Sequence, residues 1–588
     1  MTLIPLKLPA GVYRNGTEFE ASNRWRDASL VRWIDNTMRP VGGWQERDTM
    51  DTVAIRGMLS WTDLSNNQRI AAGSYNKLSV AIASGTVTDI TPVSFTDGTE
   101  DAVINTGYGG GFYGAGFYGT TRLAQGLYGE ATTWSLDNFG EILVACSSSD
   151  GQLLEWTLNV ANPAVAITNA PTDNLGLVVT EERFIFALGA GGNPRKVQWC
   201  DREDRTLWTP AATNEAGDIE LQTSGQIMQG IRTRGQTLIL TDLDAHSATY
   251  IGGQFVYGFQ RVGSSCGATS RKAAAAVDEG VFWMGQRGFF MYSGGAVADL
   301  PCEVADYVFN DINGDQISKV FAVSNQSFNE IWWFYPSATS IENDRYVSFN
   351  YAENHWGIGQ LTRTSGVDRG VFSSPIWAAD NGKTYNHEFG FNYDGASTFA
   401  ESGPISLGNG DNVMRATMLY PDEKTQGGVQ GIFKTRFYPN DTETSHGPYI
   451  MDNPTPVRFT GRQVRFRVQS PLLLDSTGIP LLNFFDAALS GSEPEYSILN
   501  QTDASGRKYG DIDNDGDVDG TDAFILLAYS QGTLFDQEIK SYIEYTLQPY
   551  LLSLYNDYPE VQALYDGYAA SDWRVGVMRL DASAGGKR

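Results

Sequence analysis

The stretch Val281–Tyr292, VFWMGQRGFFMY, decides the fold. It divides into two short strands rich in aromatic residues, VFWM and FFMY, joined by the turn GQRG at residues 285–288. Aromatic and β-branched residues favour strands, and glycine supplies the positive φ that tight hairpin turns require. The stretch therefore predicts a β-hairpin, the local unit of an antiparallel sheet.

Runs of the same kind recur on both sides of this hairpin. They begin at Ile70 (IAAG), Ile142 (ILVAC), Phe184 (FIFALG), Thr237 (TLILTD), Val281 (VFWMG), Ile331 (IWWFYP) and Ile376 (IWAAD), at spacings of 72, 42, 53, 44, 50 and 45 residues. A four-stranded propeller blade takes roughly 40–50 residues, and the longest spacing contains an insertion. We therefore predict a mainly β protein whose core is a β-propeller of six or seven blades over residues 51–400. A set of β-sandwiches is the alternative, because the same hairpins serve both folds.

Composition and charge limit the function. The chain has 588 residues with 69 acidic and 42 basic side chains, a formal net charge of −27, and 12% aromatic residues. This acidic excess argues against tight, sequence-independent binding of nucleic acid, which depends on Lys and Arg. No apolar stretch is long enough to span a membrane, and residues 1–8 lack the apolar core of a signal peptide, so we expect synthesis in a cytoplasm. The four dispersed cysteines are expected to be free, mostly buried thiols.

The pattern changes outside the propeller. We expect a strand-rich segment over 1–50, a glycine-rich aromatic loop over 107–129, a β-domain built from 401–470 and 572–588, and an inserted acidic helical module over 471–571. The loop carries GFYG twice and GLYG once, which suits either packing on its own barrel or contact with another polypeptide. The alternating stretches 457–468 and 572–580 are predicted to pair in one sheet with a basic outer face.

One loop predicts a metal site. Residues 511–522, DIDNDGDVDGTD, place Gly516 at the sharp turn of an EF-hand-like loop, and position 7 offers its backbone carbonyl. Ca²⁺ takes six to eight oxygen ligands, which this loop can supply. The predicted ligands are Asp511, Asp513, Asp515, Asp517, Asp519 and Asp522. An Asp-rich solvated turn is the alternative interpretation. The final Asp and the following helix, expected over 523–530, resemble the calcium loop of dockerin modules, which implies a cohesin-like partner as a third class of function.

Catalytic patterns are not found. The four histidines lack zinc-ligand spacing, and no nucleophile-elbow, phosphate-loop or dinucleotide motif occurs. We predict that the chain is not an enzyme. The alternative is a calcium-binding propeller lectin or glycoside hydrolase acting on surface glycans, because a propeller can bring together acids from distant blades.

The two ends of the chain carry a family resemblance. Residues 4–44, together with GRQVRFRV at 461–468, DWRVGVMRL at 572–580 and the GFYG-type loop, resemble the tail nozzle proteins of short-tailed bacteriophages, the group of tail tubular protein B. The resemblance implies a structural protein of the virion tail, a homo-oligomer expected as a hexamer, that forms and gates the channel for genome ejection. It also implies a tail adaptor as partner and viral DNA passing without sequence-specific binding. We expect the inserted module to contact a tail fibre, a tailspike or the host surface, and the arginines near 465 and 574 to contact acidic surfaces of other proteins.

Overall fold

The computed structural model describes most of the chain. The described residues are 2–586 except 83–84, 105–127, 254, 391–392, 395, 407–412, 425–428, 440, 452, 471–494, 503–506, 513, 515–516, 519–546 and 548–572. They separate into two compact units: one comprises residues 12–16 and 45–387, the other residues 1–11, 17–44 and 388–588. We call them the propeller unit and the terminal unit.

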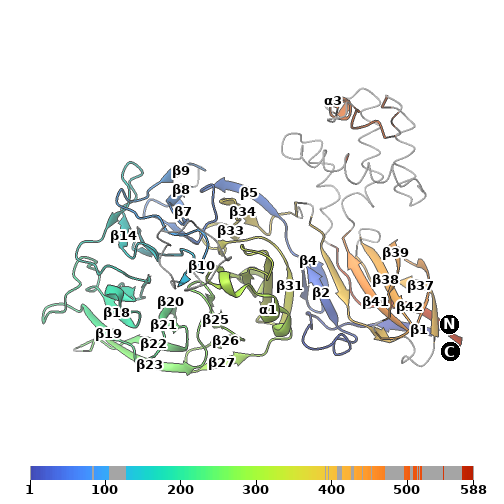
Figure 1. Ribbon diagram of the computed structural model, residues 1–588, viewed down its shortest axis with the longest axis horizontal. Helices are drawn as coiled ribbons and strands as arrows, with labels where there is room; N and C mark the ends of the chain where they lie inside the picture. The colour runs from blue at the N-terminus through green and yellow to red at the C-terminus, as the bar shows by residue number, and fades with distance from the viewer. Residues whose placement is uncertain are drawn as a thin grey trace, which may run out of the picture. The chain divides into compact units, whose positions relative to one another are not determined.

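Seven four-stranded antiparallel sheets build the described propeller unit (Figure 1). Six are continuous in sequence. The first three are β6 Gly57–Thr62, β7 Gln68–Gly73, β8 Leu78–Ile82 and β9 Val87–Asp89; β12 Trp134–Phe139, β13 Ile142–Ser147, β14 Leu153–Trp156 and β15 Val165–Ala166; and β16 Gly176–Val179, β17 Ile185–Leu188, β18 Lys196–Trp199 and β19 Gly217–Glu220. The next three are β20 Ile227–Thr233, β21 Gln236–Thr241, β22 Asp244–Tyr250 and β23 Tyr257–Ser264; β24 Ala274–Val277, β25 Gly280–Met284, β26 Phe289–Tyr292 and β27 Val297–Leu300; and β28 Phe321–Asn325, β29 Glu330–Tyr335, β30 Arg345–Asn350 and β31 His355–Gln360. The seventh contains β32 Ser365–Val367, β33 Ile376–Ala378, β34 Lys383–His387 and β5 Trp44–Thr49.

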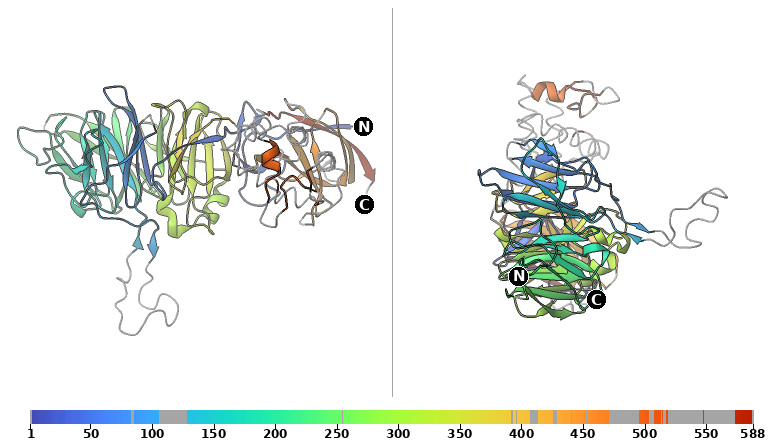
Figure 2. Two further views of the ribbon diagram at one scale, coloured as in Figure 1. Left: turned by 90° about the horizontal axis from the view of Figure 1, so that it is seen from above. Right: turned by 90° about the vertical axis from the view of Figure 1, so that its left-hand side faces the viewer.

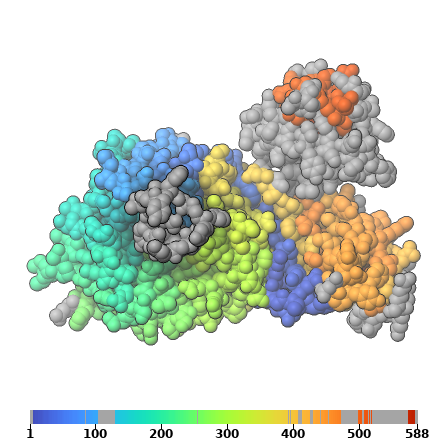
Figure 3. Space-filling model, in the orientation of Figure 1, coloured from blue at the N-terminus to red at the C-terminus, as the bar shows by residue number. Residues whose placement is uncertain are grey.

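These sheets are the blades of a β-propeller. The first strand of each sheet contacts the first strand of the next, and β32 contacts β6, so the ring closes. In Figure 3 the colours run around this unit from blue through green to yellow, in the order of the blades. Each of the seven runs identified in the sequence forms the second strand of one blade. The predicted propeller is therefore confirmed, and it has seven blades.

Buried tryptophans join neighbouring blades. The indole Nε1 of Trp134 donates to the carbonyl oxygen of Ser74 in the preceding blade at 2.6 Å, and Trp333 donates in the same way to Ala273 at 2.9 Å. Both side chains are fully buried, so each supplies a large apolar contact while its N–H keeps a partner. Gly73 is required beside Trp134, because a Cβ there would lie 2.4 Å from the indole ring.

The terminal unit is a β-sandwich made from both ends of the chain. One sheet has the order β1 Thr2–Leu6, β42 Met578–Gly586, β37 Val413–Tyr420 and β40 Thr455–Gly461. The other contains β2 Trp25–Ser29, β35 Phe399–Ser402, β41 Gln463–Gln469, β38 Gln430–Arg436 and β39 Thr444–Ile450, with β36 Ile405–Ser406 beside β41. Phe433 of β38 contacts Phe459 of β40 at a centroid distance of 4.7 Å, which packs the two sheets face to face. A separate hairpin pairs β3 Val31–Ile34 with β4 Thr37–Pro40.

One expectation for this unit is wrong. The stretch 457–468 does not pair with 572–580: it divides between β40 and β41 in different sheets, and β37 lies between β40 and β42. The bend after Gly461 sends the second half of the stretch into the opposite layer. Arg465 forms ion pairs within its own unit, with Glu401, with Glu443 at 3.3 Å and with Glu18 at 3.5 Å, and its contact with other proteins stays a prediction.

Short helices complete the described residues. They are η1 Ala190–Gly192, α1 Ala305–Asp311, η2 Gly314–Lys319, η3 Gln326–Phe328 and α3 Glu495–Leu499. In the part of the chain that the structure describes, no helix has the length and apolar character needed to cross a bilayer. The four cysteines are free as predicted, and burial raises the pKa of the Cys146 thiol to about 12.

Candidate functional site

One end of the propeller channel collects basic side chains. The first strand of each blade lines the channel, and three basic residues immediately precede such strands: Arg56 before β6, Lys272 before β24 and Lys319 before β28. Because the blades surround a common axis, these equivalent positions converge at the same end of the channel. The site therefore follows from the repeat, although Arg56 lies more than two hundred positions before Lys272 and Lys319 in the sequence.

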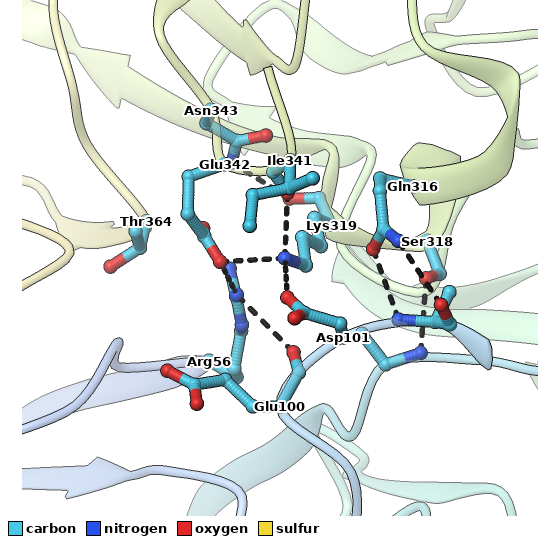
Figure 4. Close-up of polar contacts among 12 residues, drawn as sticks. Arg56, Glu100, Asp101, Gln316, Ser318, Lys319, Ile341, Glu342, Asn343 and Thr364 are labelled. Atoms are coloured by element: carbon cyan, nitrogen blue, oxygen red, sulfur yellow. Dashed lines mark hydrogen bonds and ion pairs between the residues drawn. The ribbon is translucent and has the colours of Figure 1, made fainter.

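Lys319 lies at the centre of a buried ion-pair network (Figure 4). Its side chain is fully buried, and its ammonium lies 2.6 Å from Glu342 Oε1 and 2.5 Å from Asp101 Oδ1. It also donates to the carbonyl oxygen of Ile341 at 2.7 Å, so all three of its protons have acceptors. Arg56 shares the same Glu342 oxygen at 2.5 Å. Removing one member of such a network leaves a partly buried charge without that partner and costs about 1–3 kcal/mol.

The network also anchors the base of a projecting ribbon. Strands β10 Val103–Ile104 and β11 Tyr128–Gly129 pair as a two-stranded ribbon between the first two blades, and Figure 2 shows it standing out from one face of the propeller. Gln316 exchanges two hydrogen bonds with the backbone of Ala102, at 3.0 and 3.1 Å, and Ser318 accepts from Ala131 N at 3.2 Å. Both arms of the ribbon are thus fixed to the segment before β28.

Another basic residue, Arg271, pairs with the arm of the ribbon that follows β11. Arg271, which precedes β24, forms an ion pair with Glu130 at 3.1 Å. The ribbon leaves the chain between the first and second blades, yet its anchors come from the fifth and sixth, so its base lies across this end of the channel. Residues 105–127 lie outside the described residues, and with them most of the predicted loop 107–129.

A cavity of about 150 Å³ opens beneath the network. Its lining includes Arg56, Lys272, Lys319, Gln229, Thr133 and Thr364, and none of its lining residues is acidic. Burial lowers the pKa of Lys272 to about 8, opposed in part by the charge of Asp137. The cavity therefore presents positive charge inside a strongly acidic protein.

Asp137 belongs to a separate ion pair on strand β12. One carboxylate oxygen lies 2.8 Å from Arg232, and the other accepts from Val179 N at 2.9 Å. Burial raises the pKa of Asp137 despite these partners. A carboxylate held by a cation and a backbone N–H connects the inner strands of three blades and has little freedom to contact a ligand.

The histidines do not form a metal site. Three are buried, and each makes local contacts: His246 bonds Asp244 at 3.0 Å, and His387 accepts from Arg363 Nε at 2.9 Å. Across the described ranges, no group of three His, Cys, Asp or Glu side chains is placed to hold an ion.

The predicted calcium loop is described only in part. Asp513, Asp515, Asp519 and Asp522 lie outside the described residues, as does the helix expected over 523–530. Asp511 is buried, whereas the Asp517 side chain is 85% exposed beside Lys508. The calcium site therefore stays a prediction.

Comparison with known proteins identifies no family. No family model matches the chain, and no curated protein matches its sequence. Among solved structures, virginiamycin B lyase from Staphylococcus aureus is 8% identical, with a TM-score of 0.38 over 58% of this chain and 98% of that one. YCF48 bound to D1 peptide is 10% identical, with a TM-score of 0.34 over 59% and 97% of the two chains. Similarity at this level carries no functional argument, and the fold assignment rests on the closed ring of sheets.

Proposed function

We propose that this chain is a structural subunit of a short bacteriophage tail, a ring-forming nozzle that forms and gates the channel for genome ejection. The observation that carries the proposal is the anchored ribbon. Its base is held by buried hydrogen bonds and ion pairs, and it presents a segment in which glycine alternates with Tyr and Phe. Aromatic side chains on a fixed stalk are well suited to anchor contacts with another protein.

The segments that resemble nozzle proteins support the proposal. Residues 4–44, 461–468 and 572–580 come from both ends of the sequence, and strands from all three stretches enter the terminal unit. Thr2 pairs with Ala582 and Leu6 with Met578, which joins the two ends directly. The resembling stretches therefore fold together as one unit and do not remain as separate tails.

In the proposed nozzle, DNA passes between copies of the chain. The cavity of about 150 Å³ at the propeller axis is far too small for a duplex, whose major groove alone is about 12 Å wide. A hexamer would carry six times −27, or −162 formal charges. A wall with that excess repels phosphates, so DNA can slide without binding.

The proposed partners divide between two surfaces. The ribbon segment 105–127 would contact a neighbouring copy or the tail adaptor, and the module over 471–571 would contact a fibre, a tailspike or the host surface. Asp511 and its loop would hold Ca²⁺, which stabilises the module by neutralising clustered carboxylates. We also propose that the chain has no enzymatic activity. At the described channel end, Asp101, Glu130 and Glu342 are paired with bases and are not free to act on a glycan.

Assembly tests the proposal. Residues 105–127 can be replaced by Asn-Gly, because Ile104 and Tyr128 lie opposite each other and accept a two-residue type I′ turn. The control applies the same replacement to residues 251–256, between the paired Tyr250 and Tyr257 at another hairpin tip. We expect rings of the wild type and the control with the tail adaptor of the same phage, seen by electron microscopy and light scattering. The ribbon variant should remain folded but fail to assemble. A wild type that stays monomeric with the adaptor would overturn the proposal.

A further inference from the structure

The cavity at the propeller axis contains charged donors without acceptors. Arg56 is 3% exposed; its Nη2 bonds Glu342, while Nε and Nη1 are buried and have no hydrogen-bond partner among the residues that the structure describes. Buried donors in native proteins are almost always satisfied, so each exception requires a specific explanation. Arg56 is one of the residues that line the cavity, so its positive charge lies close to a molecule held there.

Lys272 supplies a second cation to the same cavity. It comes from the blade β24–β27, across the axis from the blade of Arg56, and no ion pair of Lys272 is found among the described residues. Asp137 is the acid that most influences its charge, and Arg232 already holds that carboxylate. The positive charge of Lys272 therefore remains largely uncompensated.

Three other polar side chains of the lining already have partners. Gln229 exchanges two hydrogen bonds with the backbone of Ala274, Thr364 donates to Ala379 O at 3.2 Å, and Lys319 is held by two carboxylates. The unmet hydrogen-bonding capacity of the cavity is therefore concentrated in donors that carry positive charge. This selects for an anion over a neutral or cationic ligand.

We propose that this cavity binds a small oxyanion, of which inorganic phosphate is the type, between Arg56 and Lys272. The guanidinium of Arg56 and the ammonium of Lys272 would attract such an anion from two different blades. A volume of about 150 Å³ equals about five water molecules at 30 Å³ each, which accommodates one such anion. The bound anion joins two blades across the axis and acts as a structural staple.

The cavity has a larger neighbour beside the ribbon base. A second hollow of about 530 Å³ is lined by Thr132 and Arg271, and their chain neighbours Thr133 and Lys272 line the first cavity. The two spaces are therefore adjacent at the same end of the channel. A small ion can enter there, whereas a nucleotide or a peptide would meet the anchored ribbon.

Phosphate titration of the full chain tests the site. Thermal unfolding is measured against inorganic phosphate in a buffer free of other oxyanions, with sodium chloride at matched ionic strength. Binding to the folded state alone raises the transition temperature in a saturable manner. We expect saturation for wild type and for Lys196→Met, whose ammonium forms an exposed ion pair with Asp218. Lys272→Met should weaken the apparent affinity at least tenfold, and Arg56→Lys should weaken it to an intermediate degree.

Titrations with other anions and crystal structures complete the test. If sulfate raises the transition temperature with the same apparent affinity as phosphate, the site takes a tetrahedral anion. If acetate does so as well, the site takes any oxyanion, including a carboxylate. Either result supports the site. Anion density between Arg56 and Lys272 in crystals grown with phosphate, absent from Lys272→Met crystals, would support it directly. Three results would overturn the proposal: a rise in transition temperature with phosphate no larger than with chloride, an unchanged affinity for phosphate in Lys272→Met, or crystal density for water alone. The outcome does not depend on the proposed tail function.

Discussion

Replacing Lys272 with Met should stabilise the propeller. Burial lowers the pKa of Lys272 from 10.5 to about 8, so the folded protein holds the charged ammonium less favourably than the unfolded chain does. The pKa difference of about 2.5, at 1.36 kcal/mol for a pKa difference of 1, gives an upper bound of about 3 kcal/mol on the gain in the free energy of unfolding. Lys272 keeps part of its surface open to the cavity, which reduces the expected gain to about 1–3 kcal/mol. Met is similar in length and leaves no large void.

The sign of the pH dependence follows from the lowered pKa. Below pH 8 the lysine is charged in both states, and its full cost is present. Between pH 8 and 10.5 the folded protein releases the proton first, so the cost falls and disappears near pH 10.5. The advantage of Lys272→Met should therefore be constant from pH 6 to 8 and shrink towards pH 10.

Urea unfolding without phosphate or sulfate provides the measurement. Tryptophan fluorescence reports on the propeller, where Trp134, Trp283 and Trp333 are fully buried. Lys196→Met, at an exposed ion pair, is the matched control and should change the free energy of unfolding by less than about 1 kcal/mol. A Lys272→Met protein that is no more stable than wild type at pH 7, or whose gain is unchanged at pH 10, would refute the argument that this ammonium is desolvated and uncompensated.

Three further changes have expected outcomes. Lys319→Met should destabilise the propeller by about 1–3 kcal/mol in the same urea assay, the opposite sign to the first variant, because it takes the ammonium from the partly buried Glu342 and the more exposed Asp101, although Glu342 keeps Arg56. Gly73→Ala should cost about 1–3 kcal/mol by forcing a Cβ to within 2.4 Å of the Trp134 ring, whereas Gly288→Ala, with no atom within 4 Å, should be tolerated. Chelation of calcium should increase hydrogen exchange over residues 505–535 but not in the blades, and Asp511→Ala should reproduce it; unchanged exchange would contradict the calcium loop.

The blade repeat could be predicted because it is local. Each second strand is a short run of branched or aromatic residues, such as Ile331–Tyr335, bordered by turn residues, and this signal does not depend on distant pairing. The number of blades could not be fixed in the same way. Strand β5 completes the last blade from residues 44–49, before the first blade begins, and no local period connects it to β34 more than three hundred residues later. Closure of the ring is a non-local pairing.

The basic residues of the channel were missed for a related reason. Arg56, Lys272 and Lys319 precede the predicted second strands at Ile70, Val281 and Ile331 by 14, 9 and 12 residues. The offset varies with the length of the first strand and its hairpin, so the three positions do not align in a spacing analysis. Only the folded ring places them around one cavity. Equivalent positions in a propeller become visible when the blades are superimposed in space.

The negative net charge of the chain also gives no indication of the basic cavity at the propeller axis. The charge of −27 is a sum over the whole chain, and at the outer surface salt screens interactions beyond about 8 Å at physiological ionic strength. The cavity at the axis is shielded from that screening, and its lining is basic. An acidic exterior that repels DNA and an interior that attracts a small oxyanion are therefore compatible in one chain. If both assignments hold, increasing ionic strength should weaken repulsion of DNA by the assembled ring, while phosphate retention in the cavity should change much less, because its donors are buried.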